Sequence, residues 1–110
     1  MSTESVVNHH LEAVMAGDLD GILSDYADDA VFFHQQGTAK GTAEIRSFIE
    51  SLGDALAAIM PHFEMLHQDV QGEVMYIVWK AGDAVPLGTD TFVVRDEKIV
   101  AQSFAAHMTG

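Results

Sequence analysis

The stretch Ala16–His34, AGDLDGILSDYADDAVFFH, is the most informative part of the sequence about the fold. Gly17 is the residue type that ends a helix in the left-handed conformation, and Asp18 can cap a second, short helix directly after it. The pair Asp28-Asp29 is typical of a turn. The apolar run Ala30–His34 is expected to form a strand, with alternate side chains on opposite faces. The stretch therefore predicts a helix end, a short helix, a turn and a strand in quick succession.

The rest of the chain changes from helical to strand patterns near its middle. Before the stretch quoted above, residues 3–16 repeat apolar side chains at the spacing of an amphipathic helix. After it, a loop at residues 35–41 precedes one long helix that Thr42 opens and Pro61 ends, although Gly53 weakens it. Four strands joined by short turns are then expected, and such strands are antiparallel. These strands are His62–Val70, Val74–Ala81, Leu87–Arg95 and Ile99–Met108. Helices followed by a meander predict an α+β fold.

Composition limits the classes of partner. The 110 residues fit one domain, 1–110, and carry 17 acidic and 5 basic side chains, a formal net charge of −12. Such a surface repels phosphate, so we expect no nucleic-acid partner and no membrane partner, and a neutral or cationic small molecule is the easier ligand. The absence of cysteine excludes disulfides and thiolate metal sites. Residues 1–10 do not resemble a secretory signal, so we expect a cytoplasmic location.

The predicted strands are apolar on both faces. In the strand Val74–Ala81, Met75 and Ile77 alternate with Tyr76 and Val78, where a sheet with one wet face would alternate apolar with polar residues. One face is expected to cover the helices. We expect the other face to cover a second copy of the chain, which predicts a homodimer through the outer face of the sheet.

Four sequence stretches resemble a known superfamily: AGDLDGI at 16–22, ADDA at 27–30, GTAEIRSF at 41–48 and TDTFVVRDEKIVAQSF at 89–104. Together with the order of elements, they resemble the nuclear transport factor 2-like superfamily, and within it the ketosteroid isomerase and SnoaL-like polyketide cyclase branch. The resemblance implies a cystatin-like α+β cone, in which a curved antiparallel sheet wraps around the N-terminal helices. It also implies a pocket at the wide end of the cone, and a dimer.

Asp90 is the first candidate site residue. It shares a strand face with Gly88, Phe92 and Val94, where a carboxylate is costly to desolvate, so its pKa is expected to rise. By the resemblance, Asp90 matches the protonated aspartate that stabilises the oxyanion in the isomerase. The alternative is a solvated residue at the end of a strand.

Two histidines and a tyrosine are the other polar candidates. By the resemblance, His34 matches the isomerase's catalytic base, an aspartate there, and His10 matches its oxyanion-hole tyrosine. Alternatively, His34 caps the loop 35–41, and His10 is a core histidine bonded to the backbone. Tyr26, expected on the second helix, can donate into the pocket or lie at its rim. Because both matched positions hold histidine here, steroid enolisation is not supported residue by residue.

The expected site is an apolar pocket that needs no cofactor. The ligand-binding candidates are Tyr26, Phe32, Trp79, Phe92 and Phe104. No histidine spacing forms a metal chelate, and only a spatial convergence of His34, His10 and Asp90 would make a metal site. The favoured hypothesis is an isomerase-like, cyclase-like or hydrolase-like enzyme with His34 as general base, acting by proton transfer or water activation. The alternative is a non-catalytic ligand-binding or dimerisation module.

Overall fold

Two short helices open the chain in this computed structural model, which describes residues 2–109. Helix α1 spans Thr3–Ala16 and ends at Gly17, whose φ of 69° lies in the left-handed region. Helix α2 spans Leu19–Ser24 and begins after Asp18, whose carboxylate accepts a hydrogen bond from a backbone N–H of the first turn at 3.0 Å. Both helix boundaries that the sequence predicted are confirmed.

The single long helix expected in the middle of the chain is two helices. Helix α3 spans Gly41–Ser51, helix α4 spans Gly53–Ile59, and a short 3-10 helix, η1, spans Met60–His62. The break falls immediately before Gly53, because glycine is a weak helix former with high backbone freedom. Pro61 lies in η1 and, as predicted, marks the end of the helical region.

Six strands form one sheet in the order β2-β1-β6-β5-β4-β3. The strands are Tyr26–His34 (β1), Gly37–Lys40 (β2), Phe63–Gln71 (β3), Val74–Ala81 (β4), Val85–Arg95 (β5) and Lys98–His107 (β6). Strands β3 to β6 form the predicted antiparallel meander. Strand β1 pairs with β6 in parallel, which places the first strand of the chain beside the last.

Two expectations about the first strand were wrong. Strand β1 begins at Tyr26, so the exposed Asp28 and Asp29 lie within an extended strand and not in a turn. The pairing with β6 shifts register between Tyr26 and Val31, and this irregular stretch accommodates the two acidic residues. Residues 37–40, expected within a loop, form β2 against the end of β1.

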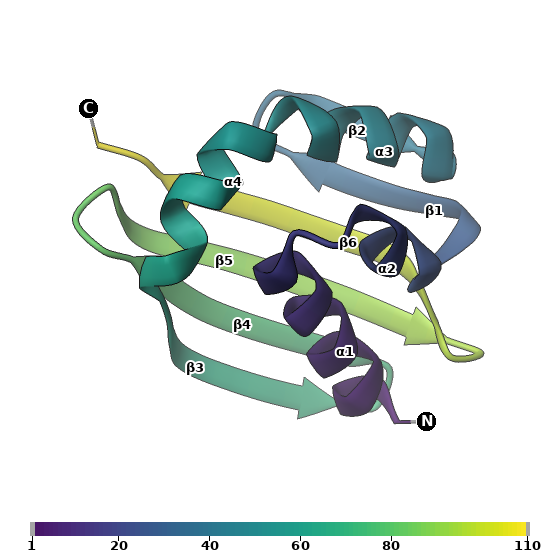
Figure 1. Ribbon diagram of the computed structural model, residues 1–110. Coiled ribbons are helices and arrows are strands. Elements are labelled where there is room, and N and C mark those ends of the chain that lie inside the picture. Colours follow the sequence, from purple (N-terminus) through teal and green to yellow (C-terminus); the bar gives the residue numbers. More distant parts are fainter. Residues whose placement is uncertain (1, 110) are drawn as a thin grey trace.

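The helices lie on one face of the curved sheet, and the core lies between the two layers (Figure 1). Helix α1 packs against β4, β5 and β6, and α3 packs against β1 and β2. Fully buried side chains from both layers meet there, among them Val7, Ile45, Met75, Phe92 and Ile99. The predicted α+β architecture, an unclosed curved sheet around N-terminal helices, is confirmed.

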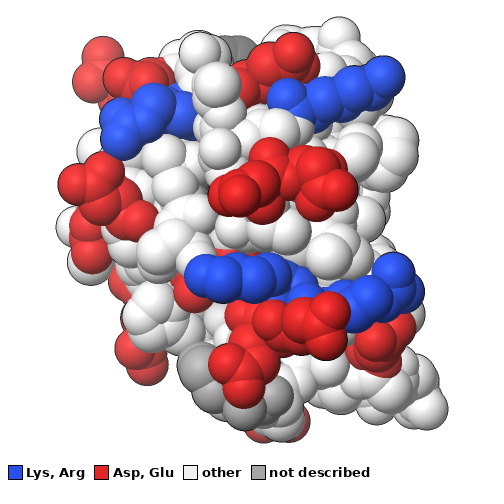
Figure 2. All heavy atoms as spheres, turned by 90° about the vertical axis from the view of Figure 1, so that its right-hand side faces the viewer, with Lys and Arg blue, Asp and Glu red and all other residues white. Residues whose placement is uncertain are grey.

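Basic side chains at the surface lie beside acidic ones. Arg46 contacts Asp20 at 3.0 Å, and Arg95 contacts Glu73 at 3.1 Å. Figure 2 shows this mixture of charges at the end of the molecule that lies on the right in Figure 1. Within residues 2–109, no helix has the length and apolar character needed to cross a membrane.

Candidate functional site

A cavity of about 110 Å³ lies between the helices and the inner face of the sheet. Its walls are almost entirely apolar. Residues from the helices α1, α3 and α4 form one side of it, including Leu11, Val14, Ile49, Leu56 and Ile59. The opposite side is the sheet, and the polar groups described below come from β1, β5, β6 and helix α1.

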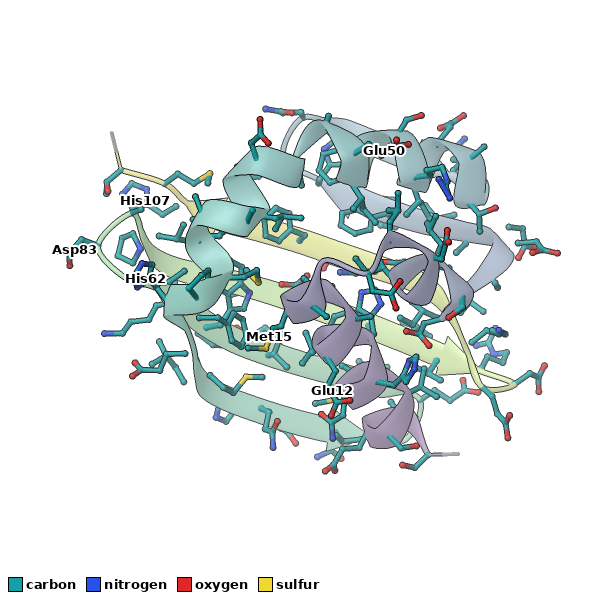
Figure 3. All side chains as sticks on the ribbon, viewed as in Figure 1. Glu12, Met15, Glu50, His62, Asp83 and His107 are labelled. Atoms are coloured by element: carbon teal, nitrogen blue, oxygen red, sulfur yellow. The ribbon has the colours of Figure 1, made fainter. Side chains whose placement is uncertain are left out.

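A surface hollow between the helices borders the cavity. The hollow and the cavity share lining residues, including Met15 of α1, Ile49 of α3 and Leu56 of α4. Met15 lies between α1 and α4 in Figure 3, at the junction of the two spaces. Among the described residues, Glu50 is the one charged residue that lines the hollow. This neighbouring surface therefore carries negative charge, which disfavours an anionic ligand.

Asp90 brings a carboxyl group to this apolar space. It lies on β5, is 8% exposed and lines the cavity. Its Oδ1 accepts a hydrogen bond from Trp79 Nε1 at 2.8 Å, and its Oδ2 accepts one from Gln102 Nε2 at 2.8 Å. Burial raises the pKa of Asp90 from 3.8 to about 7, and it outweighs the two hydrogen bonds, which favour the charged form. The raised pKa that the strand pattern predicted is confirmed.

Trp79 reaches Asp90 because the neighbouring strand has a glycine. Trp79 on β4 pairs with Gly88 on β5, and its indole lies across that glycine. A Cβ atom at position 88 would lie 2.4 Å from Cε2 of the indole, closer than non-bonded atoms can approach. The missing side chain therefore leaves the space that allows the indole N–H to meet the carboxylate.

A continuous row of polar side chains, which we call the polar strip, crosses the cavity wall: Asp90, Gln102, Tyr26 and His10. The Tyr26 hydroxyl donates a hydrogen bond to Gln102 Oε1 and lies 3.4 Å from His10 Nε2. All four residues are buried and line the cavity. The pKa of Tyr26 is raised well above its ordinary value by burial and by the charges of Asp90 and Asp25. Tyr26 is the first residue of β1, and not a residue of the second helix as expected.

Behind the polar strip lies a second carboxylate that the sequence did not single out. Asp25 follows α2, is buried, and contacts His9 Nδ1 at 2.9 and 3.0 Å. Its Oδ2 lies 3.6 Å from His10 Nδ1. Burial acts to raise the pKa of Asp25, but the contacts with His10 and His9 outweigh burial and lower it, so this carboxyl is ionised.

His34 lies outside the cavity wall. Its ring stacks on that of Phe48 with centroids 3.9 Å apart, and its Nδ1 accepts a hydrogen bond from the backbone N–H of Gln36 at 3.3 Å. Strand β6, with Phe104, separates β1 from the strand that carries Asp90. The described lining of the cavity includes His10, Tyr26 and Asp90 but not His34. The backbone bond matches the alternative interpretation, a cap on the following turn, and the general-base role of His34 stays a prediction that the cavity geometry does not support.

The five aromatic residues predicted for the pocket, Tyr26, Phe32, Trp79, Phe92 and Phe104, all line the cavity. Trp79 and Phe104 have nearly parallel rings, with an interplanar angle of 7° and centroids 6.3 Å apart. These rings give the cavity flat, apolar walls on either side of Asp90. Contact with a ligand stays a prediction for all five.

Titratable groups elsewhere do not assemble into a metal site. His62, Asp83 and His107 lie near one end of the sheet in Figure 3. Within residues 2–109, neither these side chains nor any other three His, Cys, Asp or Glu residues come together closely enough to hold a metal ion. His62, expected to open the third strand, belongs to η1.

Sequence reasoning missed Gln102, Asp25 and His9. Gln102 did leave a signal, because it is a polar residue at an inward position of a strand that is otherwise apolar on that face. Asp25 and His9 left none, since they are sixteen residues apart and meet only because α1 and α2 pack together.

Comparisons with known proteins identify the family of this chain and proteins with a similar fold. The profile of the SnoaL-like domain family matches residues 7–102. No curated protein matches the chain significantly. A solved structure of a protein from Sinorhizobium meliloti, assigned as a polyketide cyclase, has a TM-score of 0.77 and 22% identity, covering 91% of this chain and 93% of that one.

Two further solved structures are similar. The epoxide hydrolase/cyclase-like enzyme SalBIII of salinomycin pyran ring formation has a TM-score of 0.79 and 17% identity, covering 96% of this chain and 91% of its own. A protein from Kribbella flavida has a TM-score of 0.79 and 16% identity, covering 94% of this chain and 84% of its own. At such identities these likenesses show the fold. From the family match and the fold, we conclude that the chain belongs to the SnoaL-like domain family of the nuclear transport factor 2-like superfamily.

Proposed function

We propose that this protein is a cofactor-independent enzyme that moves a proton on a small, largely apolar carbonyl compound, or activates water against such a compound, in the cavity beneath the helices. One observation carries the proposal: the Asp90 carboxyl lies in an apolar cavity, held at both oxygens by side-chain donors. A carboxylic acid placed in this way is costly to maintain and is typical of a working site.

Asp90 is the group that exchanges the proton in this proposal. Its pKa of about 7 gives comparable amounts of acid and base at neutral pH, which is where general acid–base catalysis works best. As the carboxylate it removes a proton from the carbon next to a carbonyl, or from a water molecule. The proton then returns to the product from the same oxygen.

The far end of the polar strip suits the oxygen of the ligand. Tyr26 and His10 line the cavity. The Tyr26 hydroxyl donates to Gln102 Oε1 in the structure, and in this proposal it turns to donate to the ligand oxygen while His10 Nε2 lies beside it. Donors aimed at an oxygen that gains negative charge stabilise the transition state more than the ground state. The proposal therefore assigns proton transfer to Asp90 and oxygen recognition to Tyr26 and His10.

The size of the cavity and the charge around it limit the kinds of ligand that can bind. An interior of about 110 Å³ is comparable to cavities that accept one small ring such as benzene. The negative charge of Glu50 in the neighbouring hollow and the net charge of −12 favour a neutral or cationic compound. Two similar proteins, assigned as a polyketide cyclase and as an epoxide hydrolase/cyclase-like enzyme, support chemistry on carbonyl compounds or epoxides in this fold.

A non-catalytic ligand-binding module is the second candidate function. It is favoured by the same hydrogen bonds, because both Asp90 oxygens already have protein donors and need no ligand. In that case the carboxyl organises the cavity wall, and the ligand is held by apolar contacts alone.

The test compares binding with turnover in one preparation. Trp79 is the single tryptophan of the chain and lines the cavity, so its fluorescence reports binding of a monocyclic β,γ-unsaturated ketone or a monocyclic epoxide. Turnover is followed by the ultraviolet absorbance of the conjugated ketone and by chromatography of the diol. We expect turnover of one probe by the wild type and a loss of about 100-fold or more in Asp90→Asn.

Asp69→Asn is the matched control, because Asp69 is an exposed aspartate on β3. Fluorescence changes without turnover would favour the binding module. Equal turnover by the wild type and Asp90→Asn would remove Asp90 from the mechanism.

A further inference from the structure

The cavity wall is joined to the protein surface by a line of groups that can each gain and lose a proton. From the cavity outward, the line consists of Tyr26, His10, Asp25 and His9. The Tyr26 hydroxyl lies 3.4 Å from His10 Nε2, His10 Nδ1 lies 3.6 Å from Asp25 Oδ2, and Asp25 Oδ1 lies 2.9 Å from His9 Nδ1. The side chain of His10 is 3% exposed and that of His9 is 53% exposed. The line therefore begins at a buried wall and ends in water.

One atom in this line lacks the partner that its burial requires. His10 Nδ1 is buried without a hydrogen bond among the described residues, and its nearest charged neighbour is the Asp25 carboxylate. A buried ring nitrogen normally has a partner. A gap of 3.6 Å closes to hydrogen-bond length with a small side-chain rotation. The structure therefore places the Asp25 carboxyl, which His9 can protonate, beside a buried ring nitrogen that is free to accept that proton.

We propose that His9, Asp25, His10 and Tyr26 form a proton path between solvent and the cavity. An inward step places a proton from water on His9 Nε2, moves the His9 Nδ1 proton to Asp25, and moves the Asp25 proton to His10 Nδ1. This step starts with His9 protonated at Nδ1 and His10 protonated at Nε2. The His10 Nε2 proton then moves to the Tyr26 oxygen, and the Tyr26 hydroxyl turns away from Gln102 Oε1 and gives its own proton to a group in the cavity. Each transfer breaks one N–H or O–H bond and forms another, so one proton crosses and no electron is transferred.

The surroundings of His10 isolate the path from other charges. The His10 ring packs edge-to-face against Phe92 of β5 and Tyr26 of β1, with centroids 5.7 and 5.1 Å away. The acidic side chains that face this region are Asp25, after α2, and Asp90, on β5, which the Gln102 amide separates from Tyr26. An amide exchanges protons poorly, so Gln102 holds Asp90 in place and the path ends at Tyr26.

This inference rests on the proposed function and goes beyond it: Asp90 exchanges its proton within the cavity, and the path exchanges protons between water and a ligand oxygen beside Tyr26. Its test requires no turnover. In protein labelled with ¹⁵N-histidine and without ligand, NMR measures exchange of the His10 Nδ1 proton with water. That atom faces Asp25 and not the cavity, so water in the cavity does not reach it.

We expect the His10 Nδ1 proton to exchange at least about tenfold faster in the wild type than in His9→Gln, because glutamine can still donate to Asp25 but cannot pass a proton on. His67→Gln, at an exposed histidine of β3, is the control and should exchange as the wild type does. Asp25→Asn should slow exchange as His9→Gln does. If that variant fails to fold, His9→Gln decides alone, because His9 is half exposed.

Equal exchange in His9→Gln and the wild type would overturn the path. A purely structural role for Asp25 would lower the stability of Asp25→Asn and leave exchange in His9→Gln unchanged. Failure of the proposed function is a separate result, since it would appear as absence of turnover while these exchange rates keep their pattern.

Discussion

The two faces of strand β4 have nearly the same composition and opposite environments. On the inner face, Met75 and Ile77 are at most 1% exposed beneath the helices. On the outer face, the neighbouring Val74 and Tyr76 are 39% and 40% exposed. Apolar side chains on a sheet thus do not tell which face the chain itself covers. The inner face is buried because helices pack on it, whereas no described part of the chain covers these outer side chains.

The outer face extends this apolar character across the sheet. Phe33 of β1 and Leu87 of β5 are both about half exposed and add to Val74 and Tyr76 of β4. Exposed apolar surface of this kind marks interaction sites in soluble proteins. We expect a second copy of the chain to cover it, as the sequence pattern predicted.

Removing a large inner side chain should have the largest effect. Phe92 is 1% exposed, and Phe92→Ala should lower the free energy of unfolding by about 3–5 kcal/mol, because it removes apolar burial and leaves a hole beside the cavity. Urea denaturation measures the loss. A change below about 1 kcal/mol would mean that the inner face is not the packed core of the protein.

The Asp90 carboxyl should lower the free energy of unfolding as the pH rises from about 4 to 7. Asp90 has a pKa of about 7 when folded and an ordinary value of 3.8, so between about pH 4 and pH 7 the folded protein keeps a proton that the unfolded chain has lost. The contribution of Asp90 to stability is therefore greatest below pH 4 and declines up to about pH 7, by up to about 4 kcal/mol at 1.36 kcal/mol per pKa unit.

Asp90→Asn removes this titration, so the difference between wild-type and variant unfolding free energies, measured by urea denaturation across that range, should follow it. Asp25 has a lowered pKa and acts in the opposite sense, since its contribution is lost only as the pH falls below about 4. A constant difference between the wild type and Asp90→Asn would show that Asp90 is not buried as an acid.

Filling the space at Gly88 should have a moderate effect. Gly88→Ala places a methyl group against the Trp79 indole and should cost about 1–3 kcal/mol of stability. Displacing the indole also removes its hydrogen bond to Asp90, so the pKa of Asp90 should rise further. Thermal denaturation and NMR titration of Asp90 measure the two effects.

The double variant with Trp79→Phe is the sharpest control, because the clashing atoms belong to the larger indole ring. In that background, Gly88→Ala should cost clearly less and leave the pKa of Asp90 unchanged. An equal cost in both backgrounds would show that the glycine is needed for another reason. Thr89→Ala, on the neighbouring position of the same strand, controls for substitution in β5 itself.

A charge on the outer face should have the smallest effect on the folded chain. Tyr76→Lys is expected to change the stability of a single chain by no more than about 0.5 kcal/mol, because the side chain is well exposed. It should nevertheless halve the mass measured by analytical ultracentrifugation, since a lysine pair in a covered apolar face is costly. A wild type that sediments as a monomer would refute the dimer.

Local patterns in the sequence predicted most of the fold, and the differences have physical causes. Gly17 and Asp18 predicted their helix ends because capping depends on one or two neighbouring residues. The turn predicted at Asp28 and Asp29 was wrong because turn preference is also a local property. These residues lie in the part of β1 that β2 does not pair with, where the pairing with β6 is irregular, so a strand can expose acidic side chains there. The parallel partner of that strand lies about seventy residues away, which no local pattern contains.

A site residue could be predicted from the sequence where the pattern of a single strand was enough to reveal it. Asp90 stood out as an acid on an apolar strand face, and the structure places it in the cavity. His34 lies on the same face of its strand as Phe32, as the alternation of side chains predicted. Alternation predicts the face of a strand but not the distance to a residue on another strand, and β6 lies between the strands of His34 and Asp90. The contacts of Asp25 depend on how α1 and α2 pack, which only the folded chain reveals.

The parallel pairing of β1 with β6 has a kinetic consequence. Tyr26 comes from the first strand and Gln102 from the last, so their hydrogen bond closes a loop of about seventy-five residues. Contacts between such distant parts of a chain form slowly, because the entropy of a long loop is lost before any contact compensates for it. In refolding, the meander β3–β6 should therefore assemble before β1 docks. The polar wall of the cavity should appear in the last, slowest phase.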